Sequence, residues 1–205
     1  SGMPPRAALF HAWVPMTRLV HELGWVADPA PAWREAVAVL RERMGILGSA
    51  VPETQHPAKQ LARRLAGRTL FVYSAAGPTS AVGTRIRQQL NENAKLLAHS
   101  AVVPELNHNE IVGWQQAGPA QKLSVLVLRD REDPVEAKTR LDLTAQYAVR
   151  QGADVHEITS IGESRLARLA SLVQFVDHLS VDLALLVVLA PTAIPRHEDF
   201  MLRTA

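Results

Sequence analysis

The chain has 205 residues, of which 47% are hydrophobic and only 5% aromatic, and its formal net charge is +2. This length predicts one substantial domain with an extension and excludes two ordinary enzyme domains. The sequence contains no cysteine, which excludes disulfides, thiolate metal ligands and a cysteine nucleophile, and which is compatible with a cytoplasmic location. The basic residues are spread along the sequence and not clustered, so we expect no nucleic-acid surface.

Neither end of the sequence predicts membrane association. Residues 1–10 lack the basic region and apolar run of a signal peptide, and the most apolar segment, residues 182–190, is too short to span a bilayer. We therefore expect a chain that works in the cytoplasm and has no membrane partner.

The first part of the sequence has two helical patterns, over residues 4–25 and residues 31–47. Pro31 suits the first turn of the second helix, where its missing N–H is not needed. A stretch rich in proline and polar residues follows, which is typical of a connector. We expect a helical extension or linker over residues 1–50 and a compact domain over residues 51–205.

The compact part alternates between strand and helix patterns, which favours an α/β fold in three layers, with a parallel sheet between two layers of helices. The predicted helices cover residues 57–67, 79–99, 134–152 and 163–189, and the predicted strands cover residues 69–75, 100–105, 122–129 and 153–158. In sheets of this kind ligands bind beyond the carboxyl ends of the strands, so we expect the site there.

The stretch NENAKLLAHSAVVPELNHNEIVGW, residues 91–114, contains three glutamates, two histidines and four asparagines. In a helix over residues 79–99, Glu92 lies off the apolar stripe, on the same face as Lys95 and His99. By spacing alone this is a solvated polar face, with an ordinary ion pair between Glu92 and Lys95.

The loop PELNHNE, residues 104–110, offers more hydrogen-bonding groups than a turn requires. It is interpreted equally well as a functional site and as turn chemistry with a helix N-cap. His108 and Glu110 have no second histidine at ligand spacing, so we expect no metal site.

The segment YSAAGPTS, residues 73–80, is typical of a strand followed by a helix N-terminus, which can bind phosphate. It lacks the glycine spacing of a P-loop or a dinucleotide fingerprint, so we expect no cofactor. A simple N-cap by Thr79 or Ser80 explains it as well.

Several segments together resemble the C-terminal half of the bifunctional phosphoglucose/phosphomannose isomerases of the sugar isomerase (SIS) superfamily. They are SGMPPRAALF, HPAKQLARRL, QLNENAK, PELNHNEIVGW and SRLARLASLVQFVDHLSVDLALL. The resemblance covers essentially the whole chain, and PELNHNEIVGW after ENAK is its most specific signature. It implies an SIS-type three-layer fold, a homodimer, a hexose 6-phosphate substrate, and a missing N-terminal SIS half that carries the Ser/Thr cluster for the phosphate.

The resemblance also implies a role for each motif residue. Glu92 would be the base that moves a proton between C2 and C1, and Arg6 would stabilise the enediolate between the two transfers. His108 would open the sugar ring in the pocket of the neighbouring subunit. The further substrate-binding candidates are Asn107, Lys95, Thr192 and Arg203.

The sequence departs from this family in one chemical respect. The family has a lysine near its C-terminus that assists ring opening, whereas no lysine follows Lys138 here, and arginine does not readily release a proton. A non-catalytic sugar-phosphate-binding module or pseudoenzyme is therefore the alternative, and an assembly domain that docks through residues 4–47 is a third. We expect the chain by itself, without the other half, to be inactive.

Overall fold

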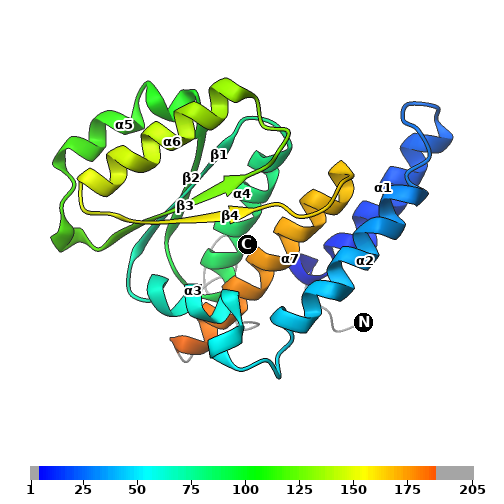
Figure 1. The fold of residues 1–205 in the computed structure, drawn as a ribbon, viewed down its shortest axis with the longest axis horizontal. Helices are drawn as coiled ribbons and strands as arrows, with labels where there is room; N and C mark the ends of the chain where they lie inside the picture. The colour runs from blue at the N-terminus through cyan, green and yellow to red at the C-terminus, as the bar shows by residue number, and fades with distance from the viewer. Residues whose placement is uncertain (1–4, 188–205) are drawn as a thin grey trace, which may run out of the picture.

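The structure is a computed structural model that describes residues 5–187. Its centre is a four-stranded sheet in which every pair of neighbouring strands is parallel, in the order β2-β1-β3-β4 (Figure 1). The strands are β1 (Thr69–Ala75), β2 (Ala98–Val103), β3 (Leu123–Arg129) and β4 (Asp154–Thr159). The α/β class expected from the alternating patterns is confirmed.

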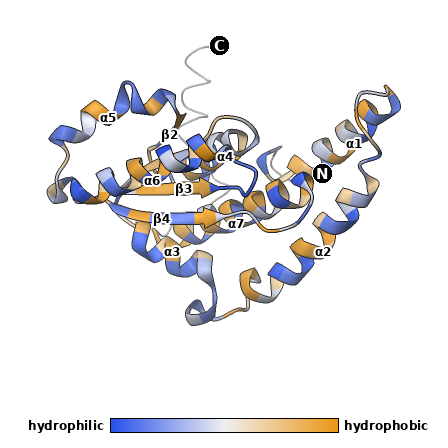
Figure 2. Ribbon diagram, turned by 45° about the horizontal axis from the view of Figure 1, so that its top comes forward, coloured by the Kyte–Doolittle hydropathy of each residue, from blue (hydrophilic) through white to orange (hydrophobic). Residues whose placement is uncertain are grey.

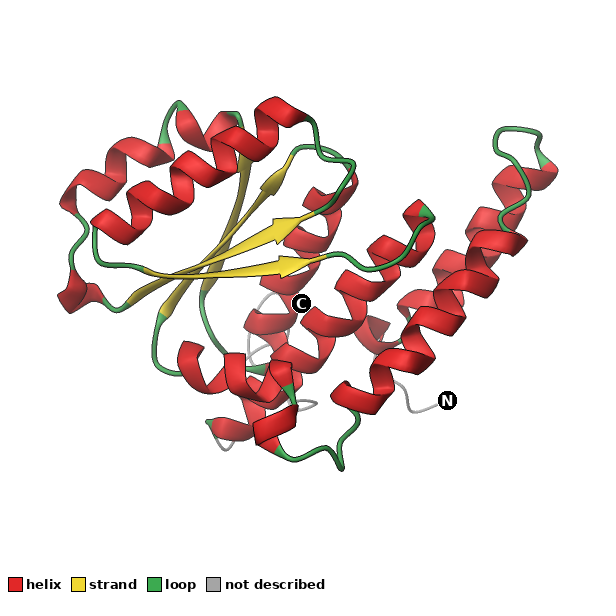
Figure 3. Cartoon of the chain, in the orientation of Figure 1, coloured by secondary structure: helices red, strands yellow, loops and turns green. Residues whose placement is uncertain are grey.

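Helices cover both faces of this sheet, so the fold has three layers (Figure 3). The α-helices are α1 (Leu9–Glu22), α2 (Ala30–Leu47), α3 (Pro57–Leu65), α4 (Pro78–Asn93), α5 (Glu110–Gly113), α6 (Val135–Arg150) and α7 (Arg165–Leu186). Short 3-10 turns lie at Pro5–Ala7, Glu53–Gln55, Glu105–Asn107, Trp114–Gln116 and Pro119–Gln121. Helices α3, α4 and α7 cover one face, α5 and α6 cover the other, and α1 and α2 lie outside α7.

The two central strands, β1 and β3, are buried on both faces, so their sequences are continuous apolar runs (Figure 2). In β3, Leu126 and Leu128 pack under α4 and α7, while Val125 and Val127 pack under α6. Alternate residues of one strand therefore belong to two separate cores.

Helix α7 is the central helix of the larger core. The side chain of Ser164 accepts a hydrogen bond from the backbone N–H of Ala167 at 3.2 Å and so caps its first turn. Among the described residues, α7 is the one helix that could cross a bilayer by length and composition. It is 56% buried over that window, as the core helix of a globular fold is.

Helices α1 and α2 form a hairpin that packs on α7 through aromatic side chains. Trp13 and Trp33 meet edge to face with ring centroids 5.1 Å apart, and the indole N–H of Trp33 donates to the Thr17 hydroxyl at 2.8 Å. The division of the chain at residue 50 into an extension and a domain stays a prediction.

The helix predicted over residues 79–99 is too long. Helix α4 ends at Asn93, Lys95 takes a left-handed conformation with φ of 53°, and β2 already begins at Ala98. The side chain of Asn91 accepts a hydrogen bond from the backbone N–H of Ala98 at 3.0 Å, which supports this change of direction. Leu97, in the connection between α4 and β2, is 84% exposed.

Candidate functional site

Arg6 and Glu92 form an ion pair between two segments that are far apart in the sequence. Arg6 belongs to the 3-10 turn before α1, and Glu92 belongs to the last turn of α4. The Arg6 Nη1 atom lies 3.2 Å from Glu92 Oε2, and the side chains are 13% and 44% exposed. The carboxylate therefore stands at a partly open surface beside a largely buried guanidinium.

A polar network of α4 and α7 side chains holds Arg6 in place. Its Nε atom donates to Oδ1 of the buried Asn93 at 2.8 Å, and the Asn93 amide donates to Ser180 of α7 at 2.9 Å. Arg85 donates to the Arg6 carbonyl at 2.8 Å and makes a two-pronged ion pair with Asp177. Both the backbone and the side chain of Arg6 are thus held by α4 and α7.

The predictions from the sequence did not include these supporting residues. Arg85, Gln89 and Asn93 recur every four residues along α4, so they share one helical face. That spacing could have been noticed in the sequence. The partners of Arg85 and Asn93, which are Asp177 and Ser180, lie on α7 and are brought close only by packing.

Lys95 also lies beside the pair, but not as predicted. Its ammonium donates to the backbone carbonyl of Glu92 at 2.6 Å, so the expected ion pair with the Glu92 carboxylate is wrong. Arg6 takes that carboxylate instead because α4 ends before Lys95. Desolvation and the positive charge of Arg6 lower the pKa of Lys95, against the opposing effect of Glu92.

His108 lies at the other end of the sheet from Glu92. Because α4 runs antiparallel to the strands, its last turn returns to their amino ends, whereas residues 104–110 follow the carboxyl end of β2. A six-residue strand such as β2 spans about 20 Å. Residues 104–110 therefore lie at the carboxyl edge, where we expected the site, but Glu92 does not, and one copy of the chain does not bring His108 to Glu92.

The other predicted binding residues are not gathered at one place. The Asn107 amide donates to the Thr144 hydroxyl of α6 at 2.7 Å, and its Oδ1 atom is buried without a hydrogen bond among the described residues. Asn107 thus faces α6, whereas its neighbour His108 is exposed. Thr192 and Arg203 lie outside the described residues.

Glu110 belongs to a partly buried polar cluster. Tyr73 of β1 donates its hydroxyl to Glu110 Oε1, and the Trp114 indole N–H donates to the Tyr73 hydroxyl at 2.9 Å. The second oxygen of Glu110 lies 2.9 Å from Nε2 of His99, which is in β2 and not on the helical face predicted for it. Burial and the hydrogen bond to Glu110 raise the pKa of Tyr73. Within residues 5–187 the structure has no group of three or more His, Asp or Glu side chains placed to bind a metal.

Contrary to the prediction, the N-cap of α4 is not Thr79 or Ser80. The cap position is Gly77, with φ of 116°, and the Ser80 and Thr79 hydroxyls donate back to the carbonyls of Gly77 and Ala75. Asp133 lies beside Thr79, at 3.4 Å, and burial raises the pKa of its carboxyl group. An acidic side chain at this position disfavours the binding of another anion.

Comparison with known proteins gives the family. Residues 54–200 match the family described as the bacterial phospho-glucose isomerase C-terminal SIS domain. A bifunctional phosphoglucose/phosphomannose isomerase of Caldicellulosiruptor bescii is 34% identical over 197 residues, which are 96% of this chain and 58% of the relative. One of the same name from Aquifex aeolicus is 34% identical over 126 residues, which are 62% of this chain and 39% of the relative.

The solved structures that resemble this chain share its fold. A glucose-6-phosphate isomerase-like protein of Thermus thermophilus aligns with a TM-score of 0.66 and 23% identity, over 84% of this chain and 55% of the other. A protein of Listeria monocytogenes described as a putative sugar-phosphate isomerase aligns over the full length of both chains, with a TM-score of 0.58 and 11% identity. The chain spans about half the length of the curated relatives it matches. By the match over residues 54–200, the chain belongs to the bacterial phospho-glucose isomerase C-terminal SIS domain family.

Proposed function

We propose that this chain is the C-terminal half of a hexose 6-phosphate aldose–ketose isomerase, which interconverts glucose 6-phosphate or mannose 6-phosphate with fructose 6-phosphate. The observation that carries the proposal is the ion pair between Arg6 and Glu92. Two motifs separated by more than eighty residues meet at a partly open surface, in a family whose relatives are named for this reaction.

In this proposal Glu92 is the base that moves a proton between C2 and C1 of the opened sugar. Negative charge develops on the enediolate oxygens between the two transfers, and a fixed cation close to them lowers the barrier. Arg6 suits this role because it stays charged and can donate to two oxygens. Its hydrogen bond to Asn93 and its ion pair with Glu92 hold it beside the base before the substrate binds.

His108 is proposed to open the sugar ring, in the pocket of a second copy of the chain. Its distance from Glu92 along β2 supports a homodimer in which each copy contributes the histidine to its neighbour. Imidazole suits ring opening since it can both donate and accept a proton near neutral pH.

The phosphate of the substrate is proposed to bind to the N-terminal SIS half of the whole protein. The acidic Asp133 beside the N-terminus of α4 supports this, because that helix end is a poor anion site in the present half. Lys95, with Asn107, Thr192 and Arg203, remains among the proposed contributors to substrate binding. Without the other half, the chain is expected to lack turnover.

The test replaces Glu92 with Gln in the intact protein and measures both fructose 6-phosphate conversion and proton exchange at C2. Loss of a general base lowers kcat by about 10²- to 10⁴-fold, and both readouts fall together. The control is Glu42→Gln, at an exposed glutamate of α2, which leaves both rates unchanged. Equal rates for the Glu92 variant and the unaltered protein would rule out the proposed base.

The absence of lysine after Lys138 favours a second candidate, a module that binds sugar phosphates without converting them. For this alternative, thermal unfolding of the intact protein shifts upward with glucose, fructose and mannose 6-phosphates while no turnover is detected. Turnover of any of the three sugars excludes it.

A further inference from the structure

We propose that Glu110, held by Tyr73, is a positioning residue for His108. This inference rests on the proposed function, in which His108 acts on the sugar ring. It gives the glutamate of the NHNE motif a role of its own, distinct from catalysis.

The contacts around His108 support this proposal because they lie on either side of it. The structure gives the His108 side chain no hydrogen bond to any residue in the described part of the chain, and the side chain is exposed. Just before it, the Asn107 amide is bonded to Thr144 at 2.7 Å. Two residues after it, the carboxylate of Glu110 turns inward to the sheet. The imidazole therefore projects from a short segment whose position is set by its neighbours.

Glu110 attaches the segment to a central strand of the sheet. Tyr73 is fully buried in the central strand β1, and Trp114, which donates to the same hydroxyl, is 4% exposed. The Tyr73 hydroxyl thus accepts from Trp114 and donates to Glu110, so the hydrogen-bond chain has one direction. It links the segment that carries His108 to a strand that cannot move without disturbing the core.

The second oxygen of Glu110 is also occupied. His99 of the edge strand β2 lies 2.9 Å from it, and the Glu110 side chain is 20% exposed. Both oxygens of Glu110 thus contact protein groups, Tyr73 on one side and His99 on the other. These contacts tie the segment to β1 and β2, as a positioning role requires.

Removing the Tyr73 hydroxyl leaves a carboxylate oxygen and an indole N–H without their partner. The bond that ties Glu110 to β1 is then lost, so we expect the segment to shift and His108 to move with it. Because a displacement of about 1 Å at a reacting group can cost up to 100-fold in rate, a small shift is measurable.

The experiment is a double-mutant cycle in the intact protein, with Tyr73→Phe, His108→Ala and the combination of both. Tyr73→Phe is expected to lower kcat about 10-fold with little change in KM, as a displaced catalytic group does. In the His108→Ala background the same substitution is expected to have no further effect on kcat. The matched control is Tyr147→Phe, since the structure records no hydrogen bond of the Tyr147 hydroxyl within the described residues.

A second pair of variants covers the case in which Tyr73→Phe does not fold. Glu110→Gln keeps an oxygen that accepts from Tyr73, and is expected to retain more activity than Glu110→Ala. Equal losses for these two variants would contradict the positioning role.

The outcomes separate this inference from the function on which it rests. If His108→Ala has the full rate of the unaltered protein, the proposed role of His108 is wrong. The other result is that His108→Ala is slow while Tyr73→Phe lowers kcat by the same factor in both backgrounds. That result keeps the role of His108 in ring opening and overturns the positioning role of Glu110.

Discussion

At the scale of single residues, Arg168 and Asp130 form a buried ion pair. Arg168 is 1% exposed, its Nε atom lies 3.0 Å from Asp130 Oδ2, and it also pairs with Glu132 at 2.6 Å. Burial acts to raise the pKa of Asp130, but hydrogen bonds from Ser160, the Glu132 backbone N–H and Arg168 outweigh it and lower the pKa. Removing Arg168 takes away the buried counter-charge of Asp130, which then keeps only its hydrogen bonds from Ser160 and the Glu132 backbone.

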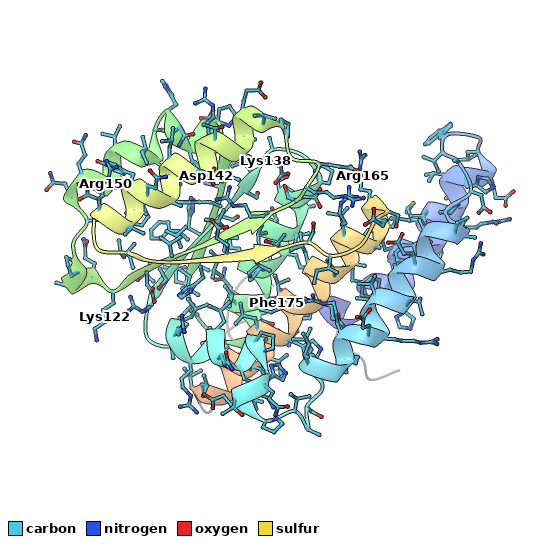
Figure 4. All side chains as sticks on the ribbon, in the orientation of Figure 1. Lys122, Lys138, Asp142, Arg150, Arg165 and Phe175 are labelled. Atoms are coloured by element: carbon cyan, nitrogen blue, oxygen red, sulfur yellow. The ribbon has the colours of Figure 1, made fainter. Side chains whose placement is uncertain are left out.

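We predict that Arg168→Ala lowers the free energy of unfolding by about 3–5 kcal/mol, since it leaves Asp130 charged and buried. Arg165→Ala is the matched control, because Arg165 also pairs with Glu132 from α7 but is 67% exposed (Figure 4). Its loss is expected to cost under about 1 kcal/mol. Urea unfolding of the two variants measures the difference. Similar losses in the free energy of unfolding would show that a buried ion pair contributes no more here than an exposed one.

At the scale of elements, the positions of the helix ends decide where the functional side chains lie. Glu92 reaches Arg6 because α4 ends at Asn93, and the chain then turns at Lys95 into β2. Helix α3 ends in a similar way, with Gly67 at φ of 74° one residue beyond the cap. Local backbone conformation at the end of α4 therefore helps to form the site as well as the fold.

Two glycines with open space around them are predicted to respond oppositely to alanine. Gly45 lies in the exposed interior of α2, where alanine is expected to stabilise the chain by about 0.5–1 kcal/mol. Gly67 has a positive φ, so alanine there is expected to destabilise the chain by about 1 kcal/mol. Urea unfolding measures both changes, and a shared sign would contradict the argument from backbone conformation.

At the scale of the whole molecule, α2, α3 and α7 meet around a group of titratable side chains. Arg43 of α2 lies 5.9 Å from the ring centre of Phe175, which is labelled in Figure 4. Near it, the rings of His56 and His178 are 6.2 Å apart, and Asp182 of α7 lies 3.9 Å from His56. The packing of three helices thus brings charges of both signs into a partly buried place.

This arrangement predicts a loss of stability in mild acid. Burial lowers the pKa of His178 below 6.5, and the charges of His56 and Arg43 act in the same direction, against Asp182 and Asp177. Below about pH 6.5 the unfolded state therefore binds more protons than the folded state, so stability falls as the pH falls through the folded pKa.

The measurement is the urea midpoint between pH 7.5 and pH 5.5. His178→Gln is expected to reduce the fall in the midpoint, whereas His11→Gln, at an exposed position of α1, leaves it unchanged. An unchanged pH dependence in His178→Gln would contradict the assignment.

The sequence by itself determined the class of fold and the family. Alternating strand and helix patterns predicted the three layers because hydrophobic periodicity is a local property of the chain, and the motifs NENAK and PELNHNEIVGW pointed to the family that the comparisons confirmed. The same periodicity placed the end of α4 wrongly, since a left-handed residue such as Lys95 has no signature in a hydrophobic pattern.

Only the tertiary structure decided how the candidate residues are arranged. Arg6 meets Glu92 across more than eighty residues, Asn93 bonds to α7, and His108 lies at the other end of the sheet. Such contacts depend on which helices pack together and in which direction each one runs. Spacing along a single chain contains no information about either, so the sequence could name the residues but not place them.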